Sequence, residues 1–238
     1  MSSALVYALV AALGNLLGAL AVTRRAARGL AVIEHFVAFG AGFMLAVAIV
    51  EVLPEAFVRS GAAAPALVLG GYLAVHLSQH TLTPHFHFGE ETHAVNRLAG
   101  SSALIGLLLH TFFDGVAIAS AFLVRPALGM MVFVAIFLHK LPEGVTIASL
   151  YLAVGRTGAQ AVGAAALLGL ATLAGVVVTD SVGVLARHGL AVAAGVTIYV
   201  AASNLVPEFQ GKRGWRLPAA FFAGAGVFVV TKLVLDNV

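Results

Sequence analysis

Residues 129–154 read GMMVFVAIFLHKLPEGVTIASLYLAV, and the segment LHKLPEG at 138–144 puts three ionisable side chains inside an apolar run. A run of this length is typical of a helix that crosses a lipid bilayer. A Lys or an Asp at the centre of such a helix costs about 2.5 to 3.5 kcal/mol on insertion scales. Polar groups in this position therefore indicate a functional site whose members partner one another.

The composition agrees with a membrane protein. Hydrophobic residues make up 61% of the 238 residues and charged residues 10%, whereas soluble domains carry roughly a quarter charged residues. The absence of cysteine excludes disulfides and thiolate metal sites. The net charge of +3 lies in the expected loops, so we interpret it as a topology signal and not as a nucleic-acid-binding surface.

Eight apolar segments follow one another, and most contain the ~20 residues that a bilayer-spanning helix needs. They are residues 4–22, 32–56, 63–79, 98–124, 127–154, 158–184, 189–208 and 217–235. The sequence therefore predicts an all-α, polytopic membrane protein with eight transmembrane helices in a single domain, residues 1–238. The first segment is not a good signal peptide, because no basic residue precedes it.

Basic residues are divided unequally between the two sets of loops. One set holds Arg24, Arg25, Arg28, Arg97, Arg156, Lys212, Arg213 and Arg216, and the opposite set holds Arg59, Arg125 and Arg187. Loops rich in Lys and Arg remain in the cytoplasm, so we expect both termini on the extracytoplasmic side. This orientation depends on the count of eight spans.

The expected cytoplasmic loop at about residues 76–97 is rich in histidine. It begins HLSQHTLTPHFHFGEETH and contains His76, His80, His85, His87 and His93. Histidine-rich tracts can bind zinc, and we predict weak, dispensable metal binding here. The alternative is a solvated loop enriched in histidine by chance.

Two related motifs lie in the fourth and fifth predicted spans. HTFFDG occupies 110–115 and HKLPEG occupies 139–144, so each reads His-x-x-x-acid-Gly. Residues four apart share one face of a helix, which places His110 beside Asp114 and His139 beside Glu143. Two imidazoles and two carboxylates suit a divalent first-row metal, zinc foremost. The motifs therefore predict a metal site between the two helices.

Both motifs lie near the middle of their spans, and the two helices are expected to run in opposite directions. The pair thus looks like an inverted repeat about the membrane centre, an arrangement that transporters often use. LPEA at 53–56 and VPEF at 206–209 repeat the pattern in spans 2 and 7. Gly115 and Gly144 are expected to permit close helix packing, while Pro142 removes an amide donor beside the site.

HTFFDG and HKLPEG resemble the paired motifs of the ZIP (Zrt/Irt-like) metal transporters, and the resemblance extends over the whole chain. GAGFMLA at 40–46 is similar to the family's second span, which makes Met44 a candidate soft ligand; ordinary Met packing is the alternative. The resemblance implies transport of divalent cations into the cytosol, homodimers, and an elevator motion of spans 1, 4, 5 and 6 against spans 2, 3, 7 and 8.

Many ZIP members bind two metal ions, and this sequence departs from that pattern. Thr111, Lys140 and Thr172 stand where ligands of the second ion are common in the family. We therefore expect one transported-metal site with the Lys140 ammonium in the neighbouring charge position. Lys140 lies three residues from Glu143 and could stabilise the ionised acids when no metal is bound. The alternative is that Lys140 snorkels to water in a cavity.

Three further acids fit a path for cations from outside. Met44, Glu51 and Glu55 lie at i, i+7 and i+11, on one face of the second span. Asp180 lies near the outer end of the sixth span. Together these acids could attract cations into an outer vestibule, although charges at helix ends near water are an equal alternative.

The sequence as a whole predicts a passive or gradient-driven carrier of zinc, or of cadmium, iron(II) or manganese, in a prokaryotic plasma membrane. It lacks a Walker motif, so ATP drive within this chain is not expected. A membrane-embedded zinc-dependent hydrolase is the rival from another class, but no HExxH motif appears. A metal-sensing receptor is the third possibility. We expect no enzymatic activity.

Overall fold

The computed structural model describes residues 3–24, 30–81 and 97–236, and every regular element there is helical. The long helices are α1 (Ser3–Arg24), α2 (Leu30–Val47), α4 (Ala64–Thr81), α5 (Arg97–Val124), α6 (Pro126–Ala153), α7 (Gly158–Ser181), α8 (Gly183–Tyr199) and α10 (Arg216–Asp236). The short ones are η1 (Ala48–Val52), α3 (Leu53–Ser60), η2 (Gly61–Ala63), η3 (Val200–Leu205) and α9 (Pro207–Gln210). The prediction of an all-α membrane protein is confirmed at this level.

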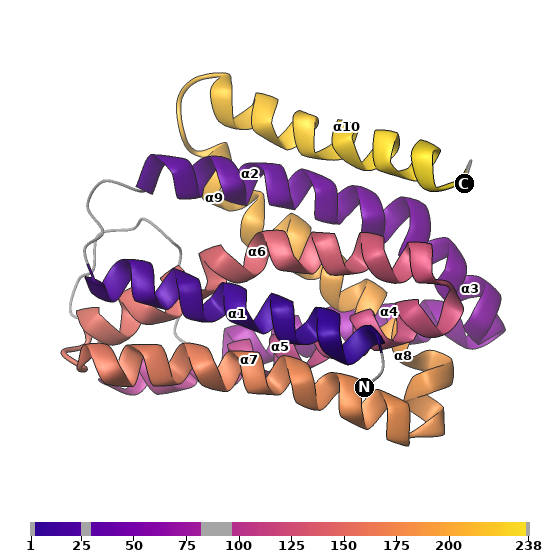
Figure 1. The fold of residues 1–238 in the computed structure, drawn as a ribbon, viewed down its shortest axis with the longest axis horizontal. Coiled ribbons are helices and arrows are strands. Elements are labelled where there is room, and N and C mark those ends of the chain that lie inside the picture. The colour runs from indigo at the N-terminus through magenta and orange to yellow at the C-terminus, as the bar shows by residue number, and fades with distance from the viewer. Residues whose placement is uncertain (1–2, 25–29, 82–96, 237–238) are drawn as a thin grey trace.

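Seven of the described segments are long and apolar enough to cross a membrane. One of them, residues 34–79, contains 46 residues, which as a single helix would extend about 69 Å, more than twice the hydrocarbon thickness. Gly61 interrupts it with a φ of 53°, a backbone conformation that glycine adopts without strain. Figure 1 shows α4 turning back from α3 at this point, so α2 and α4 are separate helices in space.

Local signals set the ends of the central helices. Pro126 occupies the first turn of α6 after an extended Arg125, where its missing amide is not needed. Thr157 and Gln160 form a capping box at the start of α7, with hydrogen bonds of 3.0 and 3.2 Å. The observed helices thus begin and end close to the predicted spans 98–124, 127–154 and 158–184.

The start of α8 differs from the sequence expectation. The helix begins at Gly183 and not near residue 189, so Arg187 lies within the helix and not in a loop. The break that separates α7 from α8 is at Val182, whose backbone is extended with φ −114° and ψ 102°. Turn-forming residues do flank Val182, namely Asp180, Ser181 and Gly183, but the predicted span was extended through them to residue 184.

The repeated LPEA and VPEF segments have a structural counterpart. A π-helical stretch, η1 or η3, immediately precedes each of them. The amide of Leu53 donates to the Ala48 carbonyl, and the amide of Val206 donates to the Ala201 carbonyl at 3.1 Å. Such single-turn π-helices occur frequently at functional sites, and the two copies support the internal repeat inferred from sequence.

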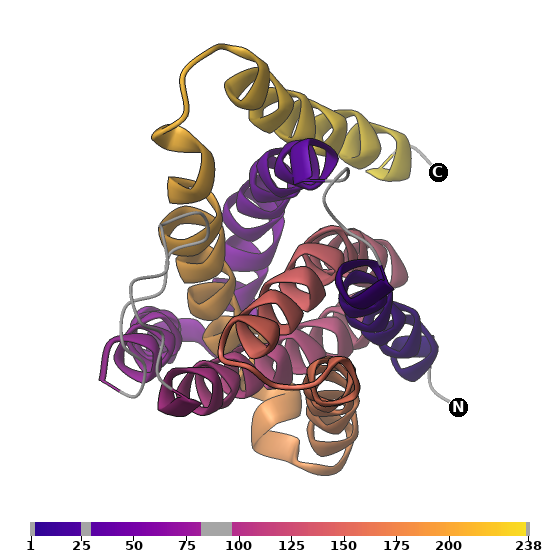
Figure 2. The ribbon, with the colours of Figure 1, turned by 90° about the vertical axis from the view of Figure 1, so that its left-hand side faces the viewer.

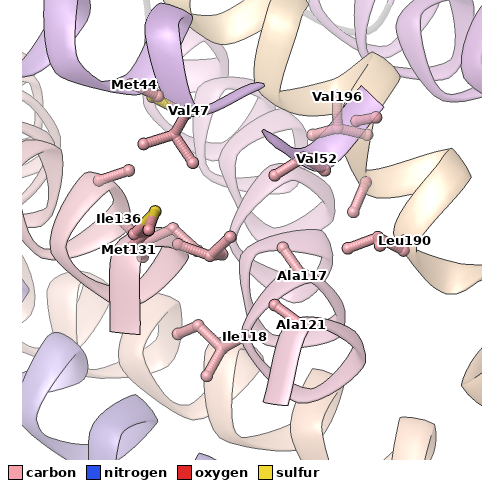
Figure 3. Close-up of a cluster of buried hydrophobic side chains, with 14 of the residues drawn as sticks. Met44, Val47, Val52, Ala117, Ile118, Ala121, Met131, Ile136, Leu190 and Val196 are labelled. Carbon is pink, nitrogen blue, oxygen red and sulfur yellow. The ribbon is translucent and has the colours of Figure 1, made fainter. Parts of the chain in front are cut away.

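The helices form two groups, which Figure 2 shows nearly end-on. Helices α1, α5, α6 and α7 pack on one another as a bundle. Beside it, α10 packs on α2, and α4 packs on α8. An apolar cluster joins the groups, with side chains from α2, α5, α6 and α8 (Figure 3). Large apolar side chains such as Leu170, Phe222 and Val230 stay exposed on the outside, as expected for helices that face lipid.

Candidate metal site

The two histidine motifs meet inside the four-helix bundle. His110 and Asp114 lie on α5, His139 and Glu143 lie on α6, and all four side chains are buried. Each residue offers a ligand atom, and these atoms lie within 4.8 Å of one another. The ring centroids of His110 and His139 are 5.4 Å apart. The four ligand atoms are therefore close enough together for one first-row metal ion to be bound among them.

Lys140 lies within the same cluster and is fully buried. Its ammonium nitrogen lies 2.6 Å from Asp114 Oδ2 and 2.8 Å from Glu143 Oε2. The lysine thus bridges the acids of the two motifs, one on its own helix and one on α5. A buried charge is tolerated only when it is paired and hydrogen-bonded. The carboxylates of Asp114 and Glu143 provide both for the Lys140 ammonium.

The histidine rings are oriented with nitrogen atoms toward the acids. His139 donates a hydrogen bond from Nδ1 to the Ala135 carbonyl, at 3.1 Å, and its Nε2 atom faces Asp114. The Nε2 atoms of His110 and His139 each lie 3.4 Å from Asp114 Oδ2. An imidazole held at Nδ1 by a carbonyl is a common arrangement in metal ligands, because the hydrogen bond sets the tautomer and ring direction.

Two polar atoms of the cluster have unused bonding capacity. Among the described residues, none provides a hydrogen bond to Glu143 Oε1 or His110 Nδ1, although both atoms are buried. Buried polar atoms normally have a partner. The carboxylate oxygen Oε1 is therefore available to a cation without breaking any interaction in the protein.

Glycine residues bring the flanking helices against the site. A Cβ atom at Gly115 would clash with the Thr172 carbonyl of α7, and one at Gly144 would clash with the Asn15 carbonyl of α1. The prediction that these glycines permit close packing is confirmed. Thr111 and Thr172 are both fully buried, and their hydroxyl groups donate to carbonyls of their own helices.

A scan against protein-family models matches residues 75–232 to the ZIP zinc transporter family. The match covers about two thirds of the chain, including both motifs. The chain belongs to the ZIP zinc transporter family. ZIP proteins are transporters and not enzymes, which confirms the non-enzymatic prediction. A search of curated proteins found no match.

Met44, the candidate fifth ligand of this ZIP chain, is fully buried on α2. It belongs to the apolar cluster and lies near Val47 in Figure 3. One turn earlier, a Cβ at Gly40 would lie 3.3 Å from Leu138 Cβ, so α2 passes α6 next to His139. Its position is close to the motif helix, and its role as a ligand stays a prediction.

The acids expected along an outer path occupy three different environments. Glu51 is buried in η1, where its carboxylate pairs with Arg125 and with Lys232 of α10. Glu55 is half-buried on α3, and Asp180 is exposed near the end of α7. In this conformation, therefore, the Glu51 carboxylate is bonded within the protein, and a cation would have to displace a basic side chain to reach it.

Most of the histidine-rich loop lies outside the described residues, which applies to His85, His87 and His93. The backbone of His80 is described, but its side chain is not. The ring of His76 is exposed on α4 and packs edge-on against Tyr199, with centroids 5.7 Å apart. Metal binding by this loop stays a prediction.

Sequence reasoning missed Asn15. This residue is fully buried on α1, and neither its amide nitrogen nor its amide oxygen has a hydrogen-bond partner among the described residues. A signal was present in the sequence, because Asn15 is the one strongly polar side chain within the apolar stretch 4–22. Polar residues inside transmembrane helices are rare and often functional.

Proposed function

We propose that this ZIP chain carries divalent transition-metal cations, zinc foremost, into the cytosol. The observation that supports the proposal is the convergence of two imidazoles and two carboxylates, all buried, within 4.8 Å. The four side chains lie midway along two apolar helices that are long enough to span a membrane. Ionisable groups at that depth are typical of an ion pathway.

We assign His110, Asp114, His139 and Glu143 as ligands of one transported ion, with Met44 as a fifth, soft ligand. When no metal ion is bound, the Lys140 ammonium takes the charge position of a second ion, as its contacts with Asp114 and Glu143 support. The hydroxyl groups of Thr111 and Thr172 donate hydrogen bonds to backbone carbonyls, which supports the proposal of a single metal ion. The donor set also admits cadmium, iron(II) and manganese.

The proposed transport cycle uses the whole chain as a single domain, residues 1–238. It has eight spans, both termini outside the cytoplasm, and a location in a prokaryotic plasma membrane as a homodimer. All four proposed ligands lie on α5 and α6, within the bundle of α1, α5, α6 and α7. That grouping is compatible with an elevator motion in which the bundle carries the ion past α2, α4, α8 and α10.

Access from outside is proposed to involve Glu51, Glu55 and Asp180, and the histidine-rich loop would bind metal weakly on the cytoplasmic side. These roles are secondary to the buried site. Zinc itself is the cargo in this scheme, so the ligands must release it as well as bind it.

The decisive test is flux of zinc and cadmium into proteoliposomes. Flux should disappear in the double variant His110→Ala/His139→Ala, while His188→Ala, whose ring contacts Ser60 outside the cluster at 3.0 Å, should transport normally. Internal pH recorded in the same vesicles reports whether protons are exchanged. Metal that binds at the motif without flux of any first-row divalent ion would overturn the carrier proposal in favour of a metal sensor.

A further inference from the structure

Asn15 is a buried residue of α1 whose side-chain amide makes no hydrogen bond with the described residues. Its side chain is fully buried, and both amide atoms lack partners within the described parts of the chain. A buried amide without hydrogen bonds is unfavourable, so such a group normally has a role in another state of the protein or with a ligand.

The packing of α1 puts Asn15 level with the second motif. A Cβ at Gly14 would lie 3.0 Å from Lys140 Cβ, and Gly144 packs directly on the backbone of Asn15. Three residues before Asn15, Ala12 packs against Gly169 of α7, at 3.0 Å from a Cβ built there. Asn15 therefore lies in the angle between α6 and α7, at the depth of Lys140 and Glu143.

Metal binding would leave the Lys140 ammonium in need of a new hydrogen-bond acceptor, which Asn15 could provide. The Lys140 ammonium group bonds Asp114 Oδ2 and Glu143 Oε2, and Asp114 Oδ2 is also the oxygen that lies 3.4 Å from the Nε2 atoms of both motif histidines. An ion held by the two imidazoles and Asp114 would compete with the ammonium for this oxygen and repel it, even where Glu143 binds the ion through its free Oε1. Lysine carries three donors and no acceptor, and a buried ammonium without an acceptor is strongly unfavourable. The ammonium must therefore move to another acceptor inside the bundle.

We propose that Asn15 is a positioning residue whose amide oxygen receives the Lys140 ammonium when a metal ion takes the oxygens of Asp114 and Glu143. This inference rests on the proposed metal site. A neutral amide suits the task, because it accepts the lysine without adding a charge that would compete for the ion. In the structure, where the Lys140 ammonium pairs with Asp114 and Glu143, the same oxygen has no hydrogen-bond partner among the described residues.

The test is a double-mutant cycle read by equilibrium zinc affinity of the purified, full-length protein, measured by competition with a fluorescent chelator. Asn15→Leu should weaken zinc binding roughly tenfold or more, because displaced Lys140 then lacks an acceptor. In a Lys140→Met background, Asn15→Leu should change the affinity little. Ser120→Ala is the matched control, since Ser120 is also buried without a partner but lies at the contact with Gly189 of α8.

An equal loss of affinity in both backgrounds would overturn the inference, since it would make Asn15 a ligand or a structural residue. No loss of affinity from Asn15→Leu in the protein that keeps Lys140 would overturn it as well. If Asn15→Leu does not fold, Asn15→Ala enters the same cycle. Because the cycle measures binding, it is independent of flux: a protein that shows the expected coupling but transports no zinc would refute the carrier proposal and leave this inference standing.

Discussion

At the scale of single residues, Lys140 is the feature that distinguishes this site. Two carboxylates on adjacent helices face the same small volume, and without a cation their mutual repulsion and desolvation would be severe. The ammonium group satisfies one oxygen of each acid, at 2.6 and 2.8 Å. Under the proposed function, the lysine stabilises the two acids when no ion is bound and competes with the ion for their oxygens.

Replacing Lys140 with alanine should separate these two effects. Without zinc, Lys140→Ala leaves two buried acids without their ammonium partner and should lower the unfolding free energy by about 3–5 kcal/mol. Zinc replaces the missing charge, so the rise in Tm on adding zinc should be larger in the variant than in the parent protein. Thermal unfolding with and without zinc measures this difference.

A suitable control is Lys212→Ala, because Lys212 pairs with Glu34 at 2.7 Å on a partly exposed surface, where an ion pair contributes about 0–1 kcal/mol. Transport by Lys140→Ala should persist with altered affinity or metal selectivity. Complete loss of transport in a folded Lys140→Ala protein would contradict a purely electrostatic role.

At the scale of helices, close approach of backbones sets the depth and rotation of the motifs. Gly18 and Gly144 allow α1 to touch the backbone of α6, and Gly115 and Gly175 do the same for α5 and α7. Contacts of small residues are the usual means of association between helices in lipid, where no hydrophobic drive between helices exists. These glycines therefore align the ligands as well as packing the bundle.

A single methyl group should test this alignment. Gly144→Ala would place Cβ against the Asn15 carbonyl, and a backbone group cannot rotate away as a side chain can. We therefore expect a loss of roughly 1–3 kcal/mol in the free energy of unfolding, together with weaker zinc binding. Gly163→Ala is the control, because open space surrounds that position on α7. It should be neutral or slightly stabilising. Equal Tm values for the two variants would show that the α1–α6 contact adapts freely.

At the scale of the whole molecule, the bundle and the second group of helices meet through two kinds of contact. One is the apolar cluster of Figure 3, to which α2, α5, α6 and α8 contribute. The other is ionic, since Glu51 of η1 pairs with Arg125, between α5 and α6, and with Lys232 of α10. If the bundle moves during transport, the pair of Glu51 and Arg125 must separate.

Neutralising Glu51 should therefore weaken the contact between the groups. Glu51→Gln removes the shared partner of Arg125 and Lys232 and should lower stability by roughly 1–3 kcal/mol, less than a fully buried pair because Arg125 is 43% exposed. Glu55→Gln, a half-buried acid on the following helix, is the matched control. Thermal unfolding in detergent compares the two variants, and indistinguishable Tm values would mean that the ionic contact contributes nothing to this conformation.

Local sequence determined the helices and the chemistry of the site. The ~20-residue apolar runs determined which segments span the membrane, and Pro126 and Thr157 determined where α6 and α7 begin. The spacing of four residues placed the histidine and the acid of each motif on the same side of their helix, because an α-helix repeats every 3.6 residues. The start of α8 at Gly183 was missed, although the turn-forming residues Asp180, Ser181 and Gly183 surround the break at Val182.

Only the tertiary structure decided which residues meet between helices. Lys140 was expected near Glu143, but its shorter contact is with Asp114 on α5. The lack of hydrogen-bond partners for Asn15 among the described residues and the pairing of Glu51 with Lys232, far apart in the sequence, were likewise not predictable. The physical reason is that the helical repeat relates only neighbours along the chain. Contacts between helices depend on their relative depth and rotation, and close packing at residues such as Gly144 and Gly115 sets both.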